Sequence, residues 1–379
     1  MTSDRTSRIL LVSLGKLNSL LLQILARRRG IAEIIVATRN LERALPAVHL
    51  ARMGAAAEGF FPAFRVIEFD LNDIAASAEA LATLRPDVTL AAPSLQSWWV
   101  LEQVEARLAD PLRPAGFGAW LPFQLLPMIR FMKAWRQSEL DTPILSAPYP
   151  DVVNPILATQ GLAPTGGVGN VCELVPKLQC LIADRLSVEP TTVRVWLAAH
   201  HALQPYVFAR SQNRGAPPPF LVSAEVNGRS SISDSELRSI LLGDYPMPAG
   251  LDFQFLTVGT FVSAIRAFLE SPEKATCIHL PAPAGLPGGY PVVVQDRVVS
   301  LDLPPTWQKE DAVEVNRASH RWDGIESIEE DGTVVLTDKT AGLLRELLRY
   351  DWPRMRFDEV EAAASELHRC FDTYVKQTR

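Results

Sequence analysis

This 379-residue chain has few cysteines, no large excess of charge of either sign and no long apolar runs. Each of these shortages argues against a class of protein. Only four cysteines are present, none of them in a C-x-x-C pair, so we expect no disulfide framework and a reduced, cytoplasmic setting. The 37 lysines and arginines, set against 43 aspartates and glutamates, form no basic stripe, which argues against a nucleic-acid partner. No stretch approaches the roughly 18 uninterrupted apolar residues of a membrane span, so we expect a soluble protein without membrane contact.

Signature motifs of several enzyme classes are missing too. G-x-S-x-G, H-E-x-x-H and the P-loop pattern do not occur, which leaves hydrolase and nucleoside-triphosphatase chemistry without support. The first part of the chain does contain a regular alternation of apolar strands and helical stretches, which is typical of parallel strands joined by crossover helices. The predicted strands are residues 8–14, 33–40, 64–71, 87–93 and 142–150. We therefore expect an α/β protein whose residues 1–160 form a doubly wound, Rossmann-like dinucleotide-binding domain.

The remainder, residues 161–379, is predicted to form a second domain, which is α+β in class, contains antiparallel strands and carries the substrate site. Apolar periodicity and turn residues define its elements. They are helices over residues 171–186, 255–270 and 358–375, a strand over residues 192–201, antiparallel strands within residues 275–304, and a hairpin with Asp331-Gly332 at its turn.

The loop after the first strand, Ser13-Leu14-Gly15-Lys16-Leu17-Asn18, occupies the place of the G-x-G-x-x-G dinucleotide fingerprint but keeps only its middle glycine. That glycine is the one that lets the backbone approach a pyrophosphate. We therefore expect Ser13, Gly15, Lys16 and Leu17 to contact a dinucleotide. A sheet that binds no cofactor is the alternative that this loop alone leaves open.

The end of the second strand indicates which dinucleotide is bound. Thr38, Arg39 and Asn40 stand where an NAD-binding protein usually carries an acidic residue for the ribose hydroxyls. Arg39 can pair with the 2′-phosphate of NADP through charge-assisted hydrogen bonds, so NADP is favoured over NAD. Ser94, after the fourth strand, is expected near the nicotinamide ribose. The adjacent Trp98-Trp99 pair is expected to consist of core or interface aromatics.

Several features in a row resemble the lactate/malate dehydrogenase superfamily, which also includes a branch of NAD- and manganese-dependent glycosidases. They are the doubly wound N-terminal half, Asn154-Pro155 after the fifth strand, Gly167-Val168-Gly169-Asn170, a histidine at the end of the next long strand, and the turn at residues 285–290. In order, these features cover residues 8–303. The ATRN and RPDVTLAAP segments also look like the NADP-binding half of saccharopine-dehydrogenase-like proteins.

The resemblance implies particular site residues. In these dehydrogenases the Asn-Pro segment lies near the nicotinamide, a role that falls to Asn154, and a histidine held by a carboxylate moves the proton that accompanies hydride transfer. His200 or His201 matches the histidine, and Glu173 stands at the place of the carboxylate, at a separation that favours His200. A group that titrates near neutrality is needed because reducing a carbonyl or imine creates negative charge. The resemblance also implies self-association, such as a homodimer.

The sequence departs from the dehydrogenases at the arginine that clamps the carboxylate of the substrate. Pro176 and Lys177 stand there, and lysine lacks the two-pronged geometry that makes arginine selective for carboxylates. Lys177 is therefore a weaker candidate for the same role, and a lactate or malate substrate is not expected. The aromatic residues 117–123 indicate a substrate that is bulkier or less acidic.

Two alternatives to a dehydrogenase stay open. In the glycosidase branch a divalent metal would be held by Cys172 and His201, although Glu173 replaces the histidine that follows the cysteine there, and one cysteine with one histidine is an incomplete metal site. A ligand-binding or scaffold protein without catalysis would explain the eroded glycine loop and the missing arginine. The favoured prediction is a metal-free, NADP-dependent oxidoreductase acting on a carbonyl/alcohol or imine/amine of a small to medium metabolite.

Overall fold

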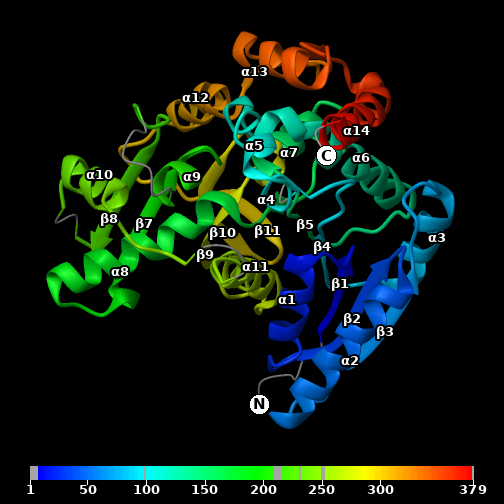
Figure 1. Ribbon diagram of the computed structural model, residues 1–379. Helices are drawn as coiled ribbons and strands as arrows, with labels where there is room; N and C mark the ends of the chain where they lie inside the picture. The colour runs from blue at the N-terminus through cyan, green and yellow to red at the C-terminus, as the bar shows by residue number, and fades with distance from the viewer. Residues whose placement is uncertain (1–6, 98–99, 209–214, 230–231, 249–251, 378–379) are drawn as a thin grey trace.

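The first sheet is parallel and has the strand order of dinucleotide-binding folds. The computed structural model describes residues 7–97, 100–208, 215–229, 232–248 and 252–377, so the prediction for Trp98 and Trp99 lies outside the described residues. In this sheet the order is β3-β2-β1-β4-β5-β6, with parallel pairing throughout (Figure 1). The strands are β1 (Ser7–Val12), β2 (Ile31–Thr38), β3 (Ala63–Glu68), β4 (Val88–Ala91), β5 (Ile144–Ser146) and β6 (Gly166–Gly167). The predicted fold class is confirmed.

Helices cover both faces of this sheet, which explains why the inner strands β1, β2 and β4 are largely apolar rather than alternating. The edge strand β3 keeps Arg65 and Glu68 exposed. Leu10 and Val12 of β1 share one hydrophobic core with α3, α6 and α14, whereas Ile9 and Leu11 share the other with α1, α2 and α11. The helices of the first half are α1 (Lys16–Leu25), α2 (Leu41–Ala57), α3 (Ile74–Leu84), α4 (Val100–Gln103), α5 (Ala106–Ala109), α6 (Leu121–Gln137) and α7 (Pro150–Ala158). None of the helices in the described part of the chain is long and apolar enough to span a membrane.

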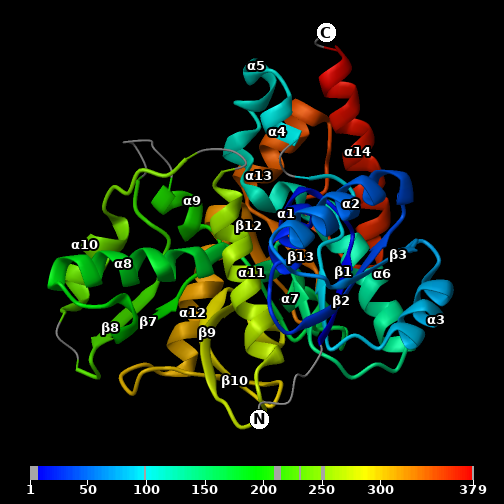
Figure 2. The same ribbon diagram turned by 90° about the horizontal axis from the view of Figure 1, so that it is seen from below.

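The second half contains three small antiparallel sheets, β7-β8, β9-β10-β11 and β12-β13-β14. A separate core lies between α8, α10, β7 and β8, whereas α11 packs on β9, β10 and α1 (Figure 2). The strands are β7 (Val193–Ala198), β8 (Leu221–Val226), β9 (Thr276–Pro281), β10 (Gly289–Gln295), β11 (Val298–Leu301), β12 (Ile325–Ile328), β13 (Val334–Leu336) and β14 (Arg354–Met355). The helices are α8 (Leu174–Leu186), α9 (Leu203–Phe208), α10 (Asp234–Leu242), α11 (Gln254–Leu269), α12 (Lys309–Ser319), α13 (Asp338–Leu343) and α14 (Val360–Gln377).

The chain crosses the boundary predicted at residue 160 in two places. β6 pairs with β5 and so extends the first sheet to Gly167. The C-terminal helix α14 packs on α6, and Figure 1 shows the two side by side. Because Leu367 of α14 shares a core with Leu10 of β1, the last part of the chain completes the cover of the N-terminal sheet. The division into residues 1–160 and 161–379 stays a prediction.

Candidate functional site

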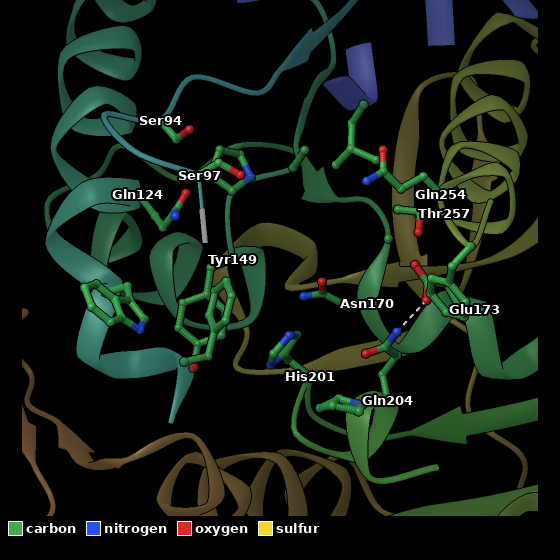
Figure 3. A pocket seen from close by; sticks show the side chains of 18 of the residues that line it. Ser94, Ser97, Gln124, Tyr149, Asn170, Glu173, His201, Gln204, Gln254 and Thr257 are labelled. Carbon is green, nitrogen blue, oxygen red and sulfur yellow. Dashed lines mark hydrogen bonds between the residues drawn. The ribbon is translucent and has the colours of Figure 1, made fainter. Parts of the chain in front are cut away.

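A cavity of about 930 Å³ opens at the carboxyl ends of four strands of the parallel sheet. The strand order changes direction between β1 and β4, and ligands of such sheets bind outside the strand ends at that point. One wall comes from the loops after β1, β4, β5 and β6, with residues Lys16, Leu17, Ala92, Ser94, Ala147, Pro148, Val168 and Gly169. Side chains that follow β7, and others from α11, form the facing wall, and Figure 3 shows several of them pointing inward.

The turn after β7 separates the two adjacent histidines. Ala199 forms a bridge with Gly289 at the start of β10, which fixes the chain just before the pair. The backbone N–H of His201 then donates to Asp151 Oδ1 at 3.0 Å, and the side chain of His201 lines the cavity. The rings of His200 and His201 are nearly perpendicular to each other, at 88°. Of the two, only His201 reaches the cavity.

Asp323 is the carboxylate that holds His201. Its Oδ2 lies 2.6 Å from His201 Nδ1, and the hydroxyl of Tyr149 donates to the same oxygen at 2.8 Å. With Asp323 engaging Nδ1, the other ring nitrogen, Nε2, is left for a ligand. The ring of Phe117 packs 4.8 Å from that of His201, measured between centroids, so the imidazole is held from the side as well.

The backbone around Asp323 explains how this side chain is held. Asp323 ends the 3₁₀ turn His320–Asp323, and Gly324 follows with a φ of 86°. A Cβ atom at Gly324 would lie 2.4 Å from Thr340 Oγ1 and 2.5 Å from the carbonyl oxygen of Ala115, so no larger residue fits. The glycine therefore lets the chain turn sharply just after Asp323, whose side chain lines the cavity.

The electrostatics of this pair favour a charged imidazole opposite a charged carboxylate. Burial lowers the pKa of His201, but attraction to Asp323 and the hydrogen bond between them outweigh burial and raise the pKa above its ordinary value. For Asp323 burial raises the pKa, and His201 outweighs burial, so the pKa lies below its ordinary value. Burial, followed by the proximity of Asp323, raises the pKa of Tyr149 well above its usual range. Tyr149 is therefore a neutral hydrogen-bond donor at this site.

The structure does not bring His200, which the spacing favoured as the proton carrier, to the cavity. His200 is fully buried and packs against His320, with 4.8 Å between the ring centroids, and it does not line the cavity. Burial, with His320 adding to it, lowers the pKa of His200 well below its ordinary value, so the ring is neutral. The physical reason is the turn after β7, which ends at Ala198: in this turn the two rings are nearly perpendicular, and only that of His201 faces the cavity.

Glu173 lines the cavity but does not orient either histidine, which corrects its predicted role. Its side chain accepts a hydrogen bond from Gln204 Nε2 at 2.8 Å and another from the side chain of Thr257 (Figure 3). Burial raises the pKa of Glu173 to about 7, and these two hydrogen bonds lower it only in part. The cavity thus contains a second group that titrates near neutrality, separate from the His201–Asp323 pair.

Lys177 and Asn154 lie outside the cavity lining, so the structure does not bring them to the predicted site. The Lys177 ammonium is buried and donates to the carbonyl oxygens of Leu241 and Gly243, each at 2.8 Å, which ties α8 to the end of α10. Asn154 lies inside α7 rather than in a turn, and its Oδ1 accepts from Ser146 Oγ at 2.8 Å. Both side chains therefore have structural partners.

Cys172 and His201, the pair expected for a metal-dependent branch, do not face each other. The Cys172 sulfur lies 3.4 Å from His279 Nδ1 and donates to the carbonyl oxygen of His279 at 3.1 Å. Burial raises the pKa of the Cys172 thiol well above its ordinary value, whereas a metal ligand must be the thiolate. No group of three or more His, Cys, Asp or Glu side chains within the described ranges is placed to hold a metal ion.

The loop after β1 replaces two of the three fingerprint glycines by other means. Ser13 takes a left-handed conformation with a φ of 68°, where a glycine is usual. The buried Asn18 amide donates to the carbonyl oxygens of Val12 and Ser13, at 3.3 and 2.7 Å, and so closes the loop. Gly15 precedes α1, has no side-chain cap, and a Cβ atom there would meet nothing within 4 Å. Open space therefore adjoins the start of the helix.

The other predicted cofactor contacts lie at strand ends on the same edge of the sheet. Thr38 ends β2, and its hydroxyl accepts from the backbone N–H of Asn40, which in turn caps α2 through Arg43. Arg39 between them is exposed and forms no ion pair with any residue that the structure describes. Ser94, after β4, lines the cavity as predicted.

The sequence did not single out Asp323, Tyr149, Asp151 or Asn170, which complete the network around His201. Asn170 donates to Asp151 Oδ2, and both anchor the segment that carries His201. A signal for Tyr149 and Asp151 existed, because they directly follow β5, and side chains at the carboxyl ends of parallel strands converge. No local pattern marks Asp323, which lies 122 residues from its partner.

Neither a protein-family profile nor a curated protein sequence matches the chain. The structure, however, is similar to solved structures of lactate and malate dehydrogenases. The lactate dehydrogenase from Eimeria maxima, solved with NADH and oxamate, is 12% identical over 85% of this chain and 93% of its own length, with a TM-score of 0.55. The malate dehydrogenase from Plasmodium falciparum is 10% identical over 97% and 100%, with a TM-score of 0.54.

A third solved structure, a lactate dehydrogenase from a deep-sea metagenome library of the Medee basin, is 12% identical over 84% of this chain and 97% of its own length, with a TM-score of 0.54. The similarity extends over most of both chains in each case. The protein therefore has the fold of the lactate and malate dehydrogenases, as the order of its sequence features implied.

Proposed function

We propose that the protein is an NADP-dependent oxidoreductase that interconverts a carbonyl and an alcohol, or an imine and an amine, on a small to medium metabolite. The observation that carries the proposal is the His201–Asp323 pair, which lines a large cavity at the point where the strand order of the sheet changes direction. A fixed imidazole with a matched carboxylate is the group that such chemistry needs for its proton.

The residues of the cavity have separate tasks in this proposal. When bound, the nicotinamide supplies the acceptor or donor of hydride. His201 Nε2 takes the proton from the substrate hydroxyl or amine during oxidation and returns it during reduction. Asp323 accepts a hydrogen bond from Nδ1–H, which fixes the orientation of the ring and leaves Nε2 for the transferred proton. The carboxylate also stabilises the imidazolium. The neutral Tyr149 hydroxyl holds Asp323 in place.

The chain offers a suitable place for a dinucleotide. The open space at Gly15 lets a pyrophosphate approach the first backbone N–H groups of α1, where the helix dipole favours negative charge. Lys16 and Leu17 continue from there into the cavity, and Ser94 lies on the same side. Arg39, which has no ion-pair partner in the part of the chain that the structure describes, is available for a 2′-phosphate. These placements support NADP as the preferred cofactor.

Titration of the purified protein with NADPH and NADH, followed by nicotinamide fluorescence, tests the proposal. We expect NADPH to bind more tightly, and Arg39→Ala to weaken NADPH by about tenfold to a hundredfold while leaving NADH unchanged. Arg29→Ala is the matched control, because Arg29 is also exposed but precedes β2 instead of following it. If neither nucleotide binds, the oxidoreductase assignment is wrong.

A further inference from the structure

The charges that line the cavity are unevenly matched. At its rim, Arg113 is paired with Glu102 at 2.7 Å and with Asp110 at 3.2 Å. Lys16, the other basic lining residue besides His201, is exposed at the start of α1. Inside the cavity, Asp323 is balanced by His201. The carboxylate of Glu173 forms no ion pair with a lysine or arginine among the described residues, and the charge of His201 acts on it without a hydrogen bond between them.

Glu173 is positioned for a ligand rather than for a structural ion pair. The residue is only 2% exposed, and its hydrogen-bond partners, Gln204 and Thr257, are both neutral. Lys177 lies one helical turn further along α8, but its ammonium is directed to the carbonyl oxygens of Leu241 and Gly243. A buried carboxylate that faces a cavity without a cation is costly unless a ligand supplies the positive charge.

Aromatic rings line the same cavity and belong to the helices that carry the hydrogen-bond partners of this carboxylate. Phe261 of α11 lines the cavity one turn after Thr257. Phe208 lies one turn after Gln204 and packs edge-on against Phe253, with 5.2 Å between centroids. The ammonium of Lys177 already lies over the Phe208 ring, 5.9 Å from its centroid, which shows that this group of rings accommodates a cation. Ring faces attract ammonium groups, and they attract them more strongly where water is excluded. Both the carboxylate and the rings therefore suit a cation and disfavour an anion.

We propose that Glu173 and the surrounding aromatic side chains bind the ammonium group of the substrate, which would be an amine-bearing alcohol or ketone rather than a hydroxy or keto acid. This inference rests on the proposed function, because it takes the same cavity as the substrate site. His201 and Glu173 line the same cavity, and each acts on the charge of the other, so one small molecule can reach both. The reacting carbon then lies at His201 and the ammonium group at Glu173.

The binding of an ammonium group should depend on pH. Glu173 must be ionised to pair with it, and burial raises the pKa of Glu173 to about 7. The titratable groups near Glu173 are His201, from the turn after β7, Cys172 on the preceding turn, and Asp151 on α7, while α11 contributes the neutral Thr257. Below pH 7 binding releases a proton, so affinity rises with pH up to about 7 and then levels off. Loss of the proton from His201 acts in the same direction.

Three probes of equal size test the inference by isothermal titration calorimetry: benzylamine, benzyl alcohol and benzoate. The protein is used without added nucleotide, so that failure of ammonium binding is distinguished from failure to bind NADPH. At pH 8 we expect benzylamine to bind at least tenfold more tightly than benzyl alcohol, and benzoate to bind most weakly. Between pH 8 and pH 6 the affinity for benzylamine should fall about tenfold, whereas that for benzyl alcohol should not change.

Variants then assign the preference to Glu173. Glu173→Gln should remove the advantage of benzylamine over benzyl alcohol, and Glu173→Asp should retain part of it. Glu79→Gln is the control, since it removes an equal charge from an exposed position on α3. Benzoate binding as tightly as benzylamine, or an amine preference that survives in Glu173→Gln, would overturn the inference. If Glu173→Gln does not fold, a benzylamine affinity of the native protein that is independent of pH overturns it equally.

Discussion

The two ends of the cavity hold their charges in different ways. At one end, His201 and Asp323 form a matched pair 2.6 Å apart, and each shifts the pKa of the other toward the charged form. At the other end, Glu173 has only neutral hydrogen-bond partners among the residues that the structure describes, and burial raises its pKa to about 7. A matched pair is fixed before any ligand arrives, whereas an unmatched carboxylate leaves its balance to the ligand. We therefore assign proton transfer to the first end and substrate selection to the second.

Replacing Asp323 with asparagine should have the largest effect, because it breaks the matched pair. His201 would remain buried without its carboxylate, so the pKa of His201 should fall from above its ordinary value to below it. The pKa is measured by NMR titration of the imidazole nitrogens. Turnover of an amine-bearing substrate should fall by about 10²- to 10⁴-fold. Asp331→Asn, at the exposed turn between β12 and β13, should leave the pKa of His201 unchanged, and an unchanged pKa in Asp323→Asn would contradict the pairing.

Replacing Glu173 with glutamine should reveal how much the ionised Glu173 carboxylate, which has no ion-pair partner within the described ranges, lowers the free energy of unfolding. The pKa of Glu173 is about 7 in the folded protein and has its ordinary value, 4.5, in the unfolded chain. The unfolded chain therefore loses this proton first as pH rises, so the free energy of unfolding of the native protein falls between pH 4.5 and 7. The shift corresponds to about 3 kcal/mol.

Urea unfolding of the native protein and of Glu173→Gln at pH 5 and pH 8 measures this cost. The native protein should lose stability relative to the variant as pH rises, by up to about 3 kcal/mol. Asp151, whose pKa burial raises to about 6, acts in the same direction but is present in both proteins and cancels. If the free energy of unfolding depends on pH in the same way in both proteins, the pKa of Glu173 is not raised in the folded protein.

Replacing Thr257 with valine should have the smallest effect of the three. The variant removes one of the two hydrogen bonds to Glu173, which favour its charged form, so the pKa of Glu173 should rise further. We expect a loss of about 1 kcal/mol in the free energy of unfolding at pH 8 and almost none at pH 5. Thr260→Val, one turn along α11 with its hydroxyl bonded to the backbone, is the control and should show no such pH dependence. A larger loss of stability at pH 5 than at pH 8 would show that Thr257 favours the neutral form of Glu173, contrary to the prediction.

The parallel sheet was predictable from the sequence, whereas the pairing in the site was not. Strands buried on both faces give continuous apolar runs, as in residues 8–14, and five strands were recognised from such runs. β6 escaped recognition because its two residues, Gly166 and Gly167, carry no side-chain pattern. The choice of carboxylate failed for a related reason. Glu173 was chosen because it stands where the resembling family carries its carboxylate, at a suitable separation from His200, but Asp323 reaches His201 through the packing of a distant segment.

The position of Asp323 in the sequence has a consequence for biosynthesis. β1 to β5 are all synthesised before the second half of the chain, whereas α14, which completes the cover of this sheet, is synthesised last. Asp323 is added much later and reaches the cavity only when Gly324 has turned the chain past Ala115. The proposed proton-transfer pair of His201 and Asp323 therefore assembles only after most of the chain has been synthesised.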